Sequence, residues 1–243
     1  MRRWSVVPNP DVPFEVRHED ELLLVADKPA GVVTEPGKGH AADSLLNGLF
    51  VRHAARLQNL GEPRDWGLLH RLDRDTSGLV LVALRREAYD ALRTGFEKRQ
   101  IKKVYWAVVA GEPQPRQGVI QRPIVEVRGP LKRATLRRDG APAITAYKIL
   151  APGRGVSLIE ARPATGRLHQ IRIHLASLGC PVLGDTMYGR SAAHVRVPRL
   201  CLHASRLSFV HPGSSRRMEV ASPMPADLAP VLRRFELEMP GEE

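Results

Sequence analysis

The stretch that most constrains the fold is residues 67–84, GLLHRLDRDTSGLVLVAL, in which a dense polar cluster leads directly into an apolar run. The run Gly78–Leu84 is short and rich in Leu and Val, which predicts a buried β-strand. Asp73 lies in the polar half between Arg71 and Arg74, and the following Thr-Ser-Gly turn can fix its place. A carboxylate held among charges beside a core strand belongs either to a satisfied structural turn or to a functional site, and the residues alone leave both interpretations open.

The charge balance points to a polyanionic partner. Lys and Arg number 37 against 26 Asp and Glu, which gives a net charge of +11 and a sequence pI of about 10.3. Such a surplus is typical of proteins that bind nucleic acid, although a biased genomic base composition also enriches Arg. With 43% hydrophobic residues, the 243-residue chain can bury a core as one large domain or two small ones.

Several kinds of site and targeting segment are absent from the sequence. The two cysteines, Cys180 and Cys201, form no CxxC pair, so neither a zinc ribbon nor a disulfide framework is indicated, and a reducing, cytoplasmic compartment is expected. No phosphate-binding glycine loop and no GxSxG elbow occurs. His169 and His174 are five residues apart on an expected helix and point to different faces, which disfavours a shared metal ion. We find no signal peptide and no apolar run of membrane-spanning length.

Many short apolar strands and few helices predict an α+β fold with a mixed, mainly antiparallel bent sheet. Apolar residues at helical spacing predict helices at 44–57, 86–100, 168–178 and 225–237. We expect extended segments or strands at 14–16, 21–27, 30–34, 78–84, 104–110, 117–127, 143–150, 155–160 and 200–210. The remaining segments are expected to be an extended tail at 1–13 and loops at 59–66 and 128–142, the second of them basic.

Two other polar features accompany Asp73. Tyr105 lies in an apolar strand, where it is either a core residue or a functional group. Arg167 and Arg172 lie off the apolar stripe of the expected helix that starts near residue 168. They form either a solvated helix face or, with the free amides of the helix start, a phosphate site.

The ordered set of motifs resembles the pseudouridine synthases, and among them the RluA-like, large-subunit rRNA type. His70–Leu79 matches the motif HRLDxxTSG in full. The other resembling segments are Glu21–Val33, Lys103–Ala107, Gly140–Tyr147, Thr165–His174 with Gly184-Asp185 and Tyr188-Gly189, and Leu202–Ala204 with His211-Pro212. Each segment alone is a weak signal, but the ordered set is specific and extends over nearly the whole chain.

This resemblance implies the pseudouridine synthase fold, with flanking helices and a central active-site cleft, and the isomerisation of uridine to pseudouridine in structured RNA. Asp73 would be the catalytic aspartate, acting either as a nucleophile at C1′ of the ribose or as a base that removes a ribose proton. Arg172 would pair with Asp73 and keep it ionised, with Arg167 as the rival for that role. Tyr105 would stack on the target base and could act in proton transfer.

The resemblance also implies a set of substrate-binding residues and the partners of the protein. Arg71 would help to displace the target base from its stack, and the basic loop Arg128–Arg138 would hold the RNA backbone. The implied partner is RNA, with rRNA placed ahead of tRNA. The protein is expected to be a monomer that acts without a membrane, a metal or another cofactor. The substrate-binding residues would be His70, Arg71, Thr76, Arg167 and Leu202.

Residues 14–238 are expected to form the catalytic domain, without an N-terminal S4-type RNA-binding domain, so substrate choice would depend on the catalytic domain. The alternative from another class is a catalytically silent RNA-binding protein or RNA chaperone on the same scaffold. The presence of Asp73, Tyr105 and Arg172 together argues against it. A metal-dependent nuclease would need a cluster of acidic ligands, and Asp73 with Asp75 is a poor one.

Overall fold

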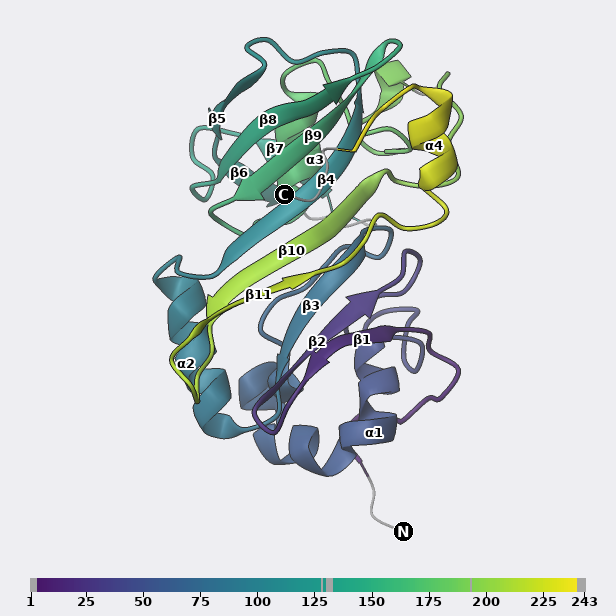
Figure 1. Cartoon of the computed structure of the whole chain (residues 1–243). Helices are drawn as coiled ribbons and strands as arrows, with labels where there is room; N and C mark the ends of the chain where they lie inside the picture. Colours follow the sequence, from purple (N-terminus) through teal and green to yellow (C-terminus); the bar gives the residue numbers. More distant parts are fainter. Residues whose placement is uncertain (1–3, 128, 130–132, 193, 240–243) are drawn as a thin grey trace. The chain divides into compact units, whose positions relative to one another are not determined.

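A computed structural model of the chain describes residues 4–127, 129, 133–192 and 194–239. They divide into two compact units: unit 1 contains Met1–Lys102 and Ala204–Ser222, and unit 2 contains Lys103–His203 and Pro223–Glu243. The return from unit 2 to unit 1 falls inside one strand, β10 (Leu202–Val210). Each unit combines antiparallel strand pairs with few helices, which confirms the predicted α+β class (Figure 1).

The sheet of unit 1 has the strand order β1-β2-β3-β10-β11. β1 (Glu15–Glu19), β2 (Leu23–Lys28) and β3 (Ser77–Ala83) pair antiparallel in sequence, and β10 pairs antiparallel with β11 (Arg217–Ala221). Every residue of β3 is buried, as the apolar run at 78–84 predicts. A strand buried on both faces needs no alternation of polar and apolar residues, which explains its continuous run of Leu and Val.

β3 approaches β10 closely at Gly78. The backbone of Gly78 has a φ of +115°, and a Cβ atom there would lie 2.3 Å from the carbonyl oxygen of Ala204. Glycine is required for both reasons, because other residues rarely adopt this φ and carry the Cβ that would clash. The glycine that follows the Asp73 loop therefore belongs to the packing of the sheet.

The helices of unit 1 are α1 (Leu45–Leu60), the short 3₁₀ helix η1 (Glu62–Gly67) and α2 (Arg86–Glu97). Ser44 caps α1: its Oγ accepts from the Asn47 amide at 3.3 Å, and the Asn47 side chain accepts from the Ser44 amide at 3.0 Å. The prediction of a loop at 59–66 is wrong, because α1 continues to Leu60 and η1 follows. The predicted helix at 86–100 ends early, since Arg99 has a left-handed backbone with φ 56°.

Residues 30–34, predicted as an extended piece, form no regular strand and contribute one isolated bridge between Val33 and Ser44. Residues 4–13 contain no helix or strand, but Val6 and Val12 are buried. The amide of Asn9 donates to the carbonyl of Asn47 at 3.0 Å, which ties this segment to α1. Across the described ranges, no helix is long and apolar enough to cross a membrane.

The main sheet of unit 2 has the strand order β4-β9-β8-β5, and all its pairs are antiparallel. Its helices are α3 (Gln170–Ala176), α4 (Ala229–Arg234) and the 3₁₀ turn η2 (Arg190–Ala192). Helix α3 is shorter than the predicted 168–178, because His169 before it has a left-handed backbone with φ 52°. The strands are β4 (Lys102–Ala110), β5 (Gln117–Gln121), β8 (Ile144–Pro152) and β9 (Val156–Pro163).

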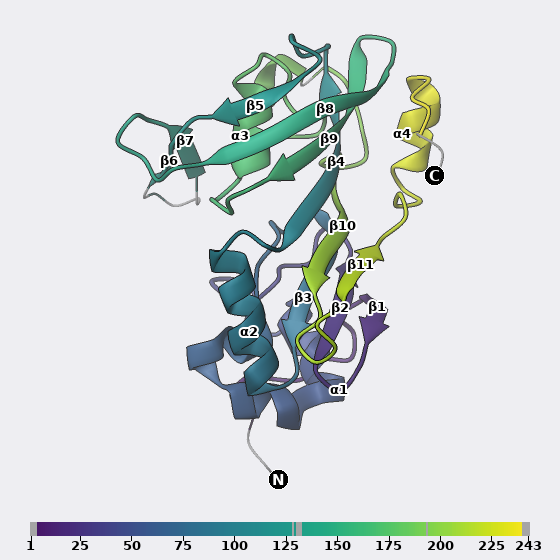
Figure 2. The same ribbon diagram turned by 60° about the vertical axis from the view of Figure 1, so that its left-hand side comes forward.

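A second, two-stranded sheet in unit 2 is the hairpin of β6 (Ile124–Val127) and β7 (Arg133–Leu136), which Figure 2 shows. The strand predicted at 117–127 is interrupted before β6 at Pro123, which has no amide proton for a strand ladder. The prediction of a loop at 128–142 is partly wrong, since this segment contains β7. Residues 128 and 130–132 of the predicted basic loop lie outside the described residues.

Asp20 joins two turns of unit 1. Its Oδ2 accepts from Nε2 of His18 at 2.8 Å and from Nε2 of His211 at 3.0 Å, and its Oδ1 accepts from the amides of Leu22 and Leu23. Burial opposes ionisation of this carboxyl, but these hydrogen bonds outweigh it and lower the pKa of Asp20 to about 2.

We predict that Asp20→Ala lowers the thermal unfolding midpoint at neutral pH. A carboxyl whose pKa is about 2 when folded and about 3.8 when unfolded stabilises the fold fully above about pH 4, and this contribution is lost as the pH falls toward 2. Unfolding midpoints of wild type and variant, measured from pH 7 downward, should therefore converge below pH 4. The exposed neighbour Glu21, changed to Ala, is the control. A difference for Asp20→Ala that stays constant to pH 2 would contradict this account.

Candidate active site

Asp73 lies in the loop 70–76 that precedes β3 in unit 1, and the backbone around it is fixed by hydrogen bonds. Oγ1 of Thr34 donates to the carbonyl of Leu72 at 2.9 Å and accepts from the amide of Leu72 at 3.1 Å. The amide of Thr76 donates to the carbonyl of Asp73 at 3.1 Å and closes a turn. The side chain of Asp73 is half-buried. The loop thus holds a carboxyl group in a defined place while leaving part of it accessible.

Lys28, at the end of β2, is fully buried and supports the same loop. Its Nζ donates to the carbonyls of Val32 at 2.7 Å, Pro29 at 2.9 Å and Arg74 at 3.1 Å. The amide of Gly31 also donates to the carbonyl of Arg74, at 2.8 Å. A buried ammonium is stable only when its protons are bound, so Lys28 ties residues 29–32 to the residue after Asp73. Lys28 is absent from the predicted site, because its acceptors are backbone atoms that no residue type reveals.

The other predicted residues of this loop have their own contacts. Arg71 is exposed and forms an ion pair with Glu35, and Arg74 pairs with Asp75 at 3.0 Å. Nε2 of His70 accepts from the amide of Leu81 at 3.0 Å, and its ring lies 5.4 Å from the ring of Phe96.

Thr76 is buried. Within the part of the chain that the structure describes, no hydrogen-bond partner is found for its Oγ1. Thr76 supports the loop through its amide, which donates to the carbonyl of Asp73, and His70 supports it through its ring.

In unit 2, Arg172 on α3 forms a two-pronged ion pair with Asp185. Its Nε donates to Oδ2 at 2.7 Å and its Nη2 donates to Oδ1 at 2.9 Å. The side chain of Asp185 is fully buried and also accepts from the amides of Met187 and Tyr188, both at 2.9 Å. Burial raises the pKa of this carboxyl, but the hydrogen bonds and charge of Arg172 outweigh burial and leave the pKa lowered. Asp185 thus fixes the guanidinium that the sequence singles out.

The sequence analysis quoted Asp185 among the motif residues without giving it a role. Its signal was present: a Gly-Asp pair followed at short distance by Tyr188-Gly189. The ring of Tyr188 adds a contact, with its centroid 5.3 Å from Cζ of Arg172.

The remaining predicted residues of unit 2 differ in exposure. Tyr105 is buried on β4 opposite Ala161 of β9, and Leu202 is buried at the start of β10. Arg167 is exposed, and its Nε donates to the carbonyl of Pro142 at 3.2 Å. Lys103, two residues before Tyr105, points its Nζ at Gly166, and burial lowers the pKa of Lys103 to about 8. The sequence analysis assigned no role to Lys103.

The histidines near α3 serve as hydrogen-bonding groups. His174 is fully buried, with Nδ1 2.9 Å from Oγ1 of Thr145 and Nε2 3.0 Å from the carbonyl oxygen of Arg122. Nδ1 of His169 lies 2.9 Å from the hydroxyl oxygen of Tyr188. Among the residues that the structure describes, no group of three or more His, Cys, Asp or Glu side chains is arranged to hold a metal ion.

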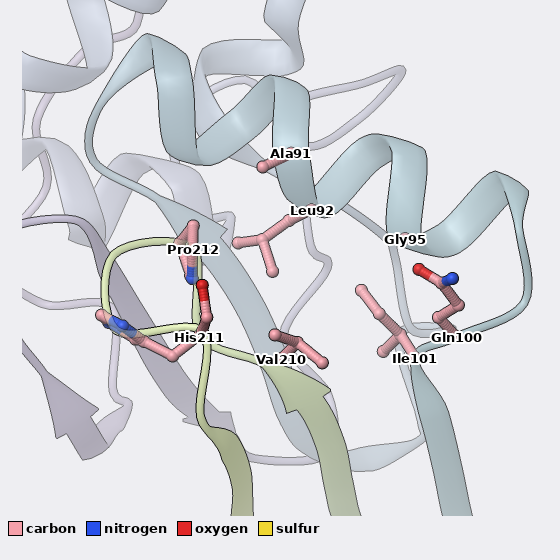
Figure 3. Close-up of a pocket in the computed structure, with 9 residues that line it drawn as sticks. Ala91, Leu92, Gly95, Gln100, Ile101, Val210, His211 and Pro212 are labelled. Atoms are coloured by element: carbon pink, nitrogen blue, oxygen red, sulfur yellow. The ribbon is translucent and has the colours of Figure 1, made fainter.

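A cavity of about 250 Å³ lies in unit 1 between α2 and the turn after β10. Leu92 on α2, Ile101 after it and Val210 at the end of β10 give it an apolar wall (Figure 3). None of the predicted site residues lines it.

The predicted site residues therefore fall into two groups. His70, Arg71, Asp73 and Thr76 share one loop of unit 1, and Tyr105, Arg167, Arg172 and Leu202 lie in unit 2. The predicted pairing of Asp73 with Arg172 or Arg167 joins the two units and stays a prediction.

Comparison with known proteins identifies the family. The sequence model described as RNA pseudouridylate synthase matches residues 22–177, more than half of the chain. The chain belongs to the RNA pseudouridylate synthase family. This family match covers the whole Asp73 loop, β4 with Tyr105, and α3 with Arg172.

Other members of the RNA pseudouridylate synthase family extend the match. The chain is 42% identical over 210 residues to an uncharacterized RNA pseudouridine synthase of Chloroflexus aurantiacus, and this covers 86% of the chain and 66% of that protein. It is 38% identical over 227 residues to the ribosomal large subunit pseudouridine synthase D of Zymomonas mobilis, covering 90% and 71%. The chain thus spans about two thirds of the length of these relatives.

The solved structure of the human RNA pseudouridylate synthase domain containing 4 is similar, with a TM-score of 0.72 at 26% identity, over 93% of this chain and 94% of that one. The human RNA pseudouridylate synthase domain containing 1 gives a TM-score of 0.68 at 28% identity, over 89% and 85%. Both similarities confirm the predicted pseudouridine synthase fold.

We predict that Asp185→Ala destabilises the protein strongly, because it removes the buried carboxylate that binds the guanidinium of Arg172 and the amides of Met187 and Tyr188. Breaking a buried pair in this way costs about 3–5 kcal/mol. Denaturant unfolding curves measure the change. The matched control is Asp139→Ala, which removes a two-pronged but exposed partner of Arg137 and should leave stability almost unchanged. Equal effects of the two variants would contradict the assigned importance of Asp185.

Proposed function

We propose that this chain is an RNA pseudouridine synthase that isomerises specific uridines to pseudouridine in structured RNA. The observation that carries the proposal is the complete HRLDRDTSG loop at residues 70–78, in a chain of this family, with the backbone on both sides of Asp73 fixed by hydrogen bonds. A reaction that depends on one carboxylate needs that group held in a fixed position, since small displacements of a reacting group lower the rate by large factors.

The reaction breaks the N1–C1′ bond of uridine and forms a C5–C1′ bond, with loss of the proton on C5 and gain of a proton on N1. Reactant and product have the same composition and oxidation state, so the isomerisation requires no redox or group-transfer cofactor. In this proposal Asp73 acts as its carboxylate at the ribose, either as the nucleophile at C1′ or as the base that removes a ribose proton. Tyr105 stacks on the uracil, and Arg172 keeps a positive charge near the carboxylate.

The remaining site residues complete the proposal. His70, Arg71, Thr76, Arg167 and Leu202 form the substrate-binding set, within a catalytic domain of residues 14–238. Two of the relatives with 38–39% identity are named ribosomal large subunit pseudouridine synthase D, which supports rRNA as the substrate ahead of tRNA. In this proposal the protein is a monomer that acts in the cytoplasm without a metal or another cofactor.

We predict that Asp73→Asn abolishes pseudouridine formation while leaving RNA affinity nearly unchanged, because it removes a charge and little shape. Pseudouridine is mapped in total RNA by carbodiimide labelling and primer extension in cells with the wild-type gene, the variant or a deletion. Asp75→Asn is the control, since Asp75 is the neighbouring carboxylate and is paired with Arg74. Sites that persist with Asp73→Asn would refute the role of Asp73. RNA binding by wild type without any pseudouridine would favour a silent RNA-binding protein.

RNA affinity should fall steeply with salt, because phosphate contacts release counterions. We predict that Arg138→Gln, on the exposed segment after β7, reduces the slope of log Kd against log salt by about 0.7–0.9. Filter binding between low and high salt gives the slopes. Arg154→Gln controls for the same loss of net charge, because Arg154 already pairs with Glu236. Identical slopes for wild type and Arg138→Gln would show that this segment does not contact phosphates.

A further inference from the structure

The hydroxyl group of Tyr188 meets the backbone of the β6–β7 hairpin. The amide of Ala134, in the middle of β7, donates to this hydroxyl oxygen at 2.9 Å, and the carbonyl oxygen of Ala134 lies 3.3 Å from it. Nδ1 of His169 lies on another side at 2.9 Å. A hydroxyl has one proton and two lone pairs. It can therefore accept from the amide of Ala134 and donate to the carbonyl of Ala134, or to Nδ1 of His169 when that nitrogen carries no proton.

The hairpin depends on such external contacts. A two-stranded sheet is marginally stable by itself, and its edge strands carry amides and carbonyls that have no partner in the sheet. Tyr188 binds both backbone groups of Ala134 at that edge. Strand β7 lies beside helix α3 (Figure 2). A small apolar cluster adds to this contact. Its members are Ile124, Ala134, Ala143 and Ile173, with Leu136, Leu168 and Tyr188 packed against them.

The other end of the same side chain contacts the arginine of the proposed active site. The ring centroid of Tyr188 is 5.3 Å from Cζ of Arg172, a distance at which a guanidinium is attracted to an aromatic face. The amide of Tyr188 donates to Oδ1 of Asp185 at 2.9 Å, and the same oxygen accepts from Nη2 of Arg172. One residue therefore contacts the hairpin with its hydroxyl and Arg172 with its ring, while its amide binds the carboxylate of Asp185 that also binds Arg172.

We propose that Tyr188 is a positioning residue that couples the basic β6–β7 hairpin to Arg172, so that RNA held by the hairpin also fixes this arginine. This inference rests on the proposed function, which it deepens. The exposed cationic residue beside Ala134 is Arg133. Its positive charge gives the hairpin a group that can bind the phosphates of RNA. Binding energy obtained away from the reacting atoms is then used to orient a group that acts on them.

Tyr188→Phe separates the two contacts, because it removes the hydroxyl and keeps the ring over Arg172. We expect KM and the Kd for RNA to rise about 5- to 10-fold, the effect of one net hydrogen bond, and kcat to fall, because RNA on the hairpin no longer fixes Arg172. Tyr188→Leu also removes the ring, and kcat should fall further. The substrate is a transcript of large-subunit rRNA that contains a mapped site. An unchanged KM for Tyr188→Phe would overturn the proposal.

A matched control and a double-mutant cycle distinguish positioning from general stability. Tyr147→Phe removes a hydroxyl that donates to the carbonyl of Pro115 at 2.9 Å, in the same unit but outside the hairpin, and should leave KM unchanged. If Tyr188 acts through the hairpin, the effects of Tyr188→Phe and Arg133→Ala on Kd will be non-additive. Additive effects, or an equal effect of Tyr147→Phe, would refute the coupling.

The failure of this inference is distinguishable from failure of the proposed function. Kd values for the cycle are measured in the Asp73→Asn background, where turnover does not occur, and pseudouridine formation is measured separately with wild type. Absence of pseudouridine in wild type would refute the proposed function. Additive Kd effects in a protein whose wild type is active would refute the role of Tyr188 alone.

Discussion

The buried ion pair of Arg172 and Asp185 is the interaction on which the proposed site residues of unit 2 depend. Removing two charges from water is costly, and the attraction between them offsets this only when the remaining lone pairs are also bound. Here the amides of Met187 and Tyr188 supply those bonds. The segment after Asp185 must therefore turn back on its own carboxylate, and this brings the ring of Tyr188 over the guanidinium. The position of Arg172 is a consequence of this local folding.

Unit 1 also contains a buried cation. Lys28 is buried, and three backbone carbonyls accept hydrogen bonds from its ammonium. Because one of these carbonyls belongs to Arg74, the charge is stabilised only while the Asp73 loop keeps its conformation. Thr34 acts on the other side of Asp73 through Leu72. Each unit thus contains a buried cation at a proposed catalytic residue. Lys28 stabilises the loop that carries Asp73, and Arg172 is itself the proposed residue on α3.

The sequence predicts those features that depend on local pattern. Continuous apolar runs locate β2 and β3. The motif around Asp73 predicted the family because its residue types occur in a fixed order. Contacts between distant residues were missed, including the roles of Lys28 and Asp185. So was β7, whose four residues look like part of a basic loop and become a strand only by pairing with β6. Helix ends were displaced where a residue such as His169 or Arg99 has a left-handed backbone.

The three carbonyl contacts of Lys28 have a consequence for chemical labelling. An ammonium has three protons, and each has a carbonyl oxygen within 3.1 Å here. Reagents that acylate lysine need a free, neutral amine that can approach the reagent, and Lys28 offers neither while its loop is closed. Its acylation rate therefore reports how often the segment that carries Asp73 opens, whereas exposed lysines such as Lys98 report only the reactivity of the reagent. One buried amine thus makes the opening of the Asp73 loop measurable by mass spectrometry, without substrate.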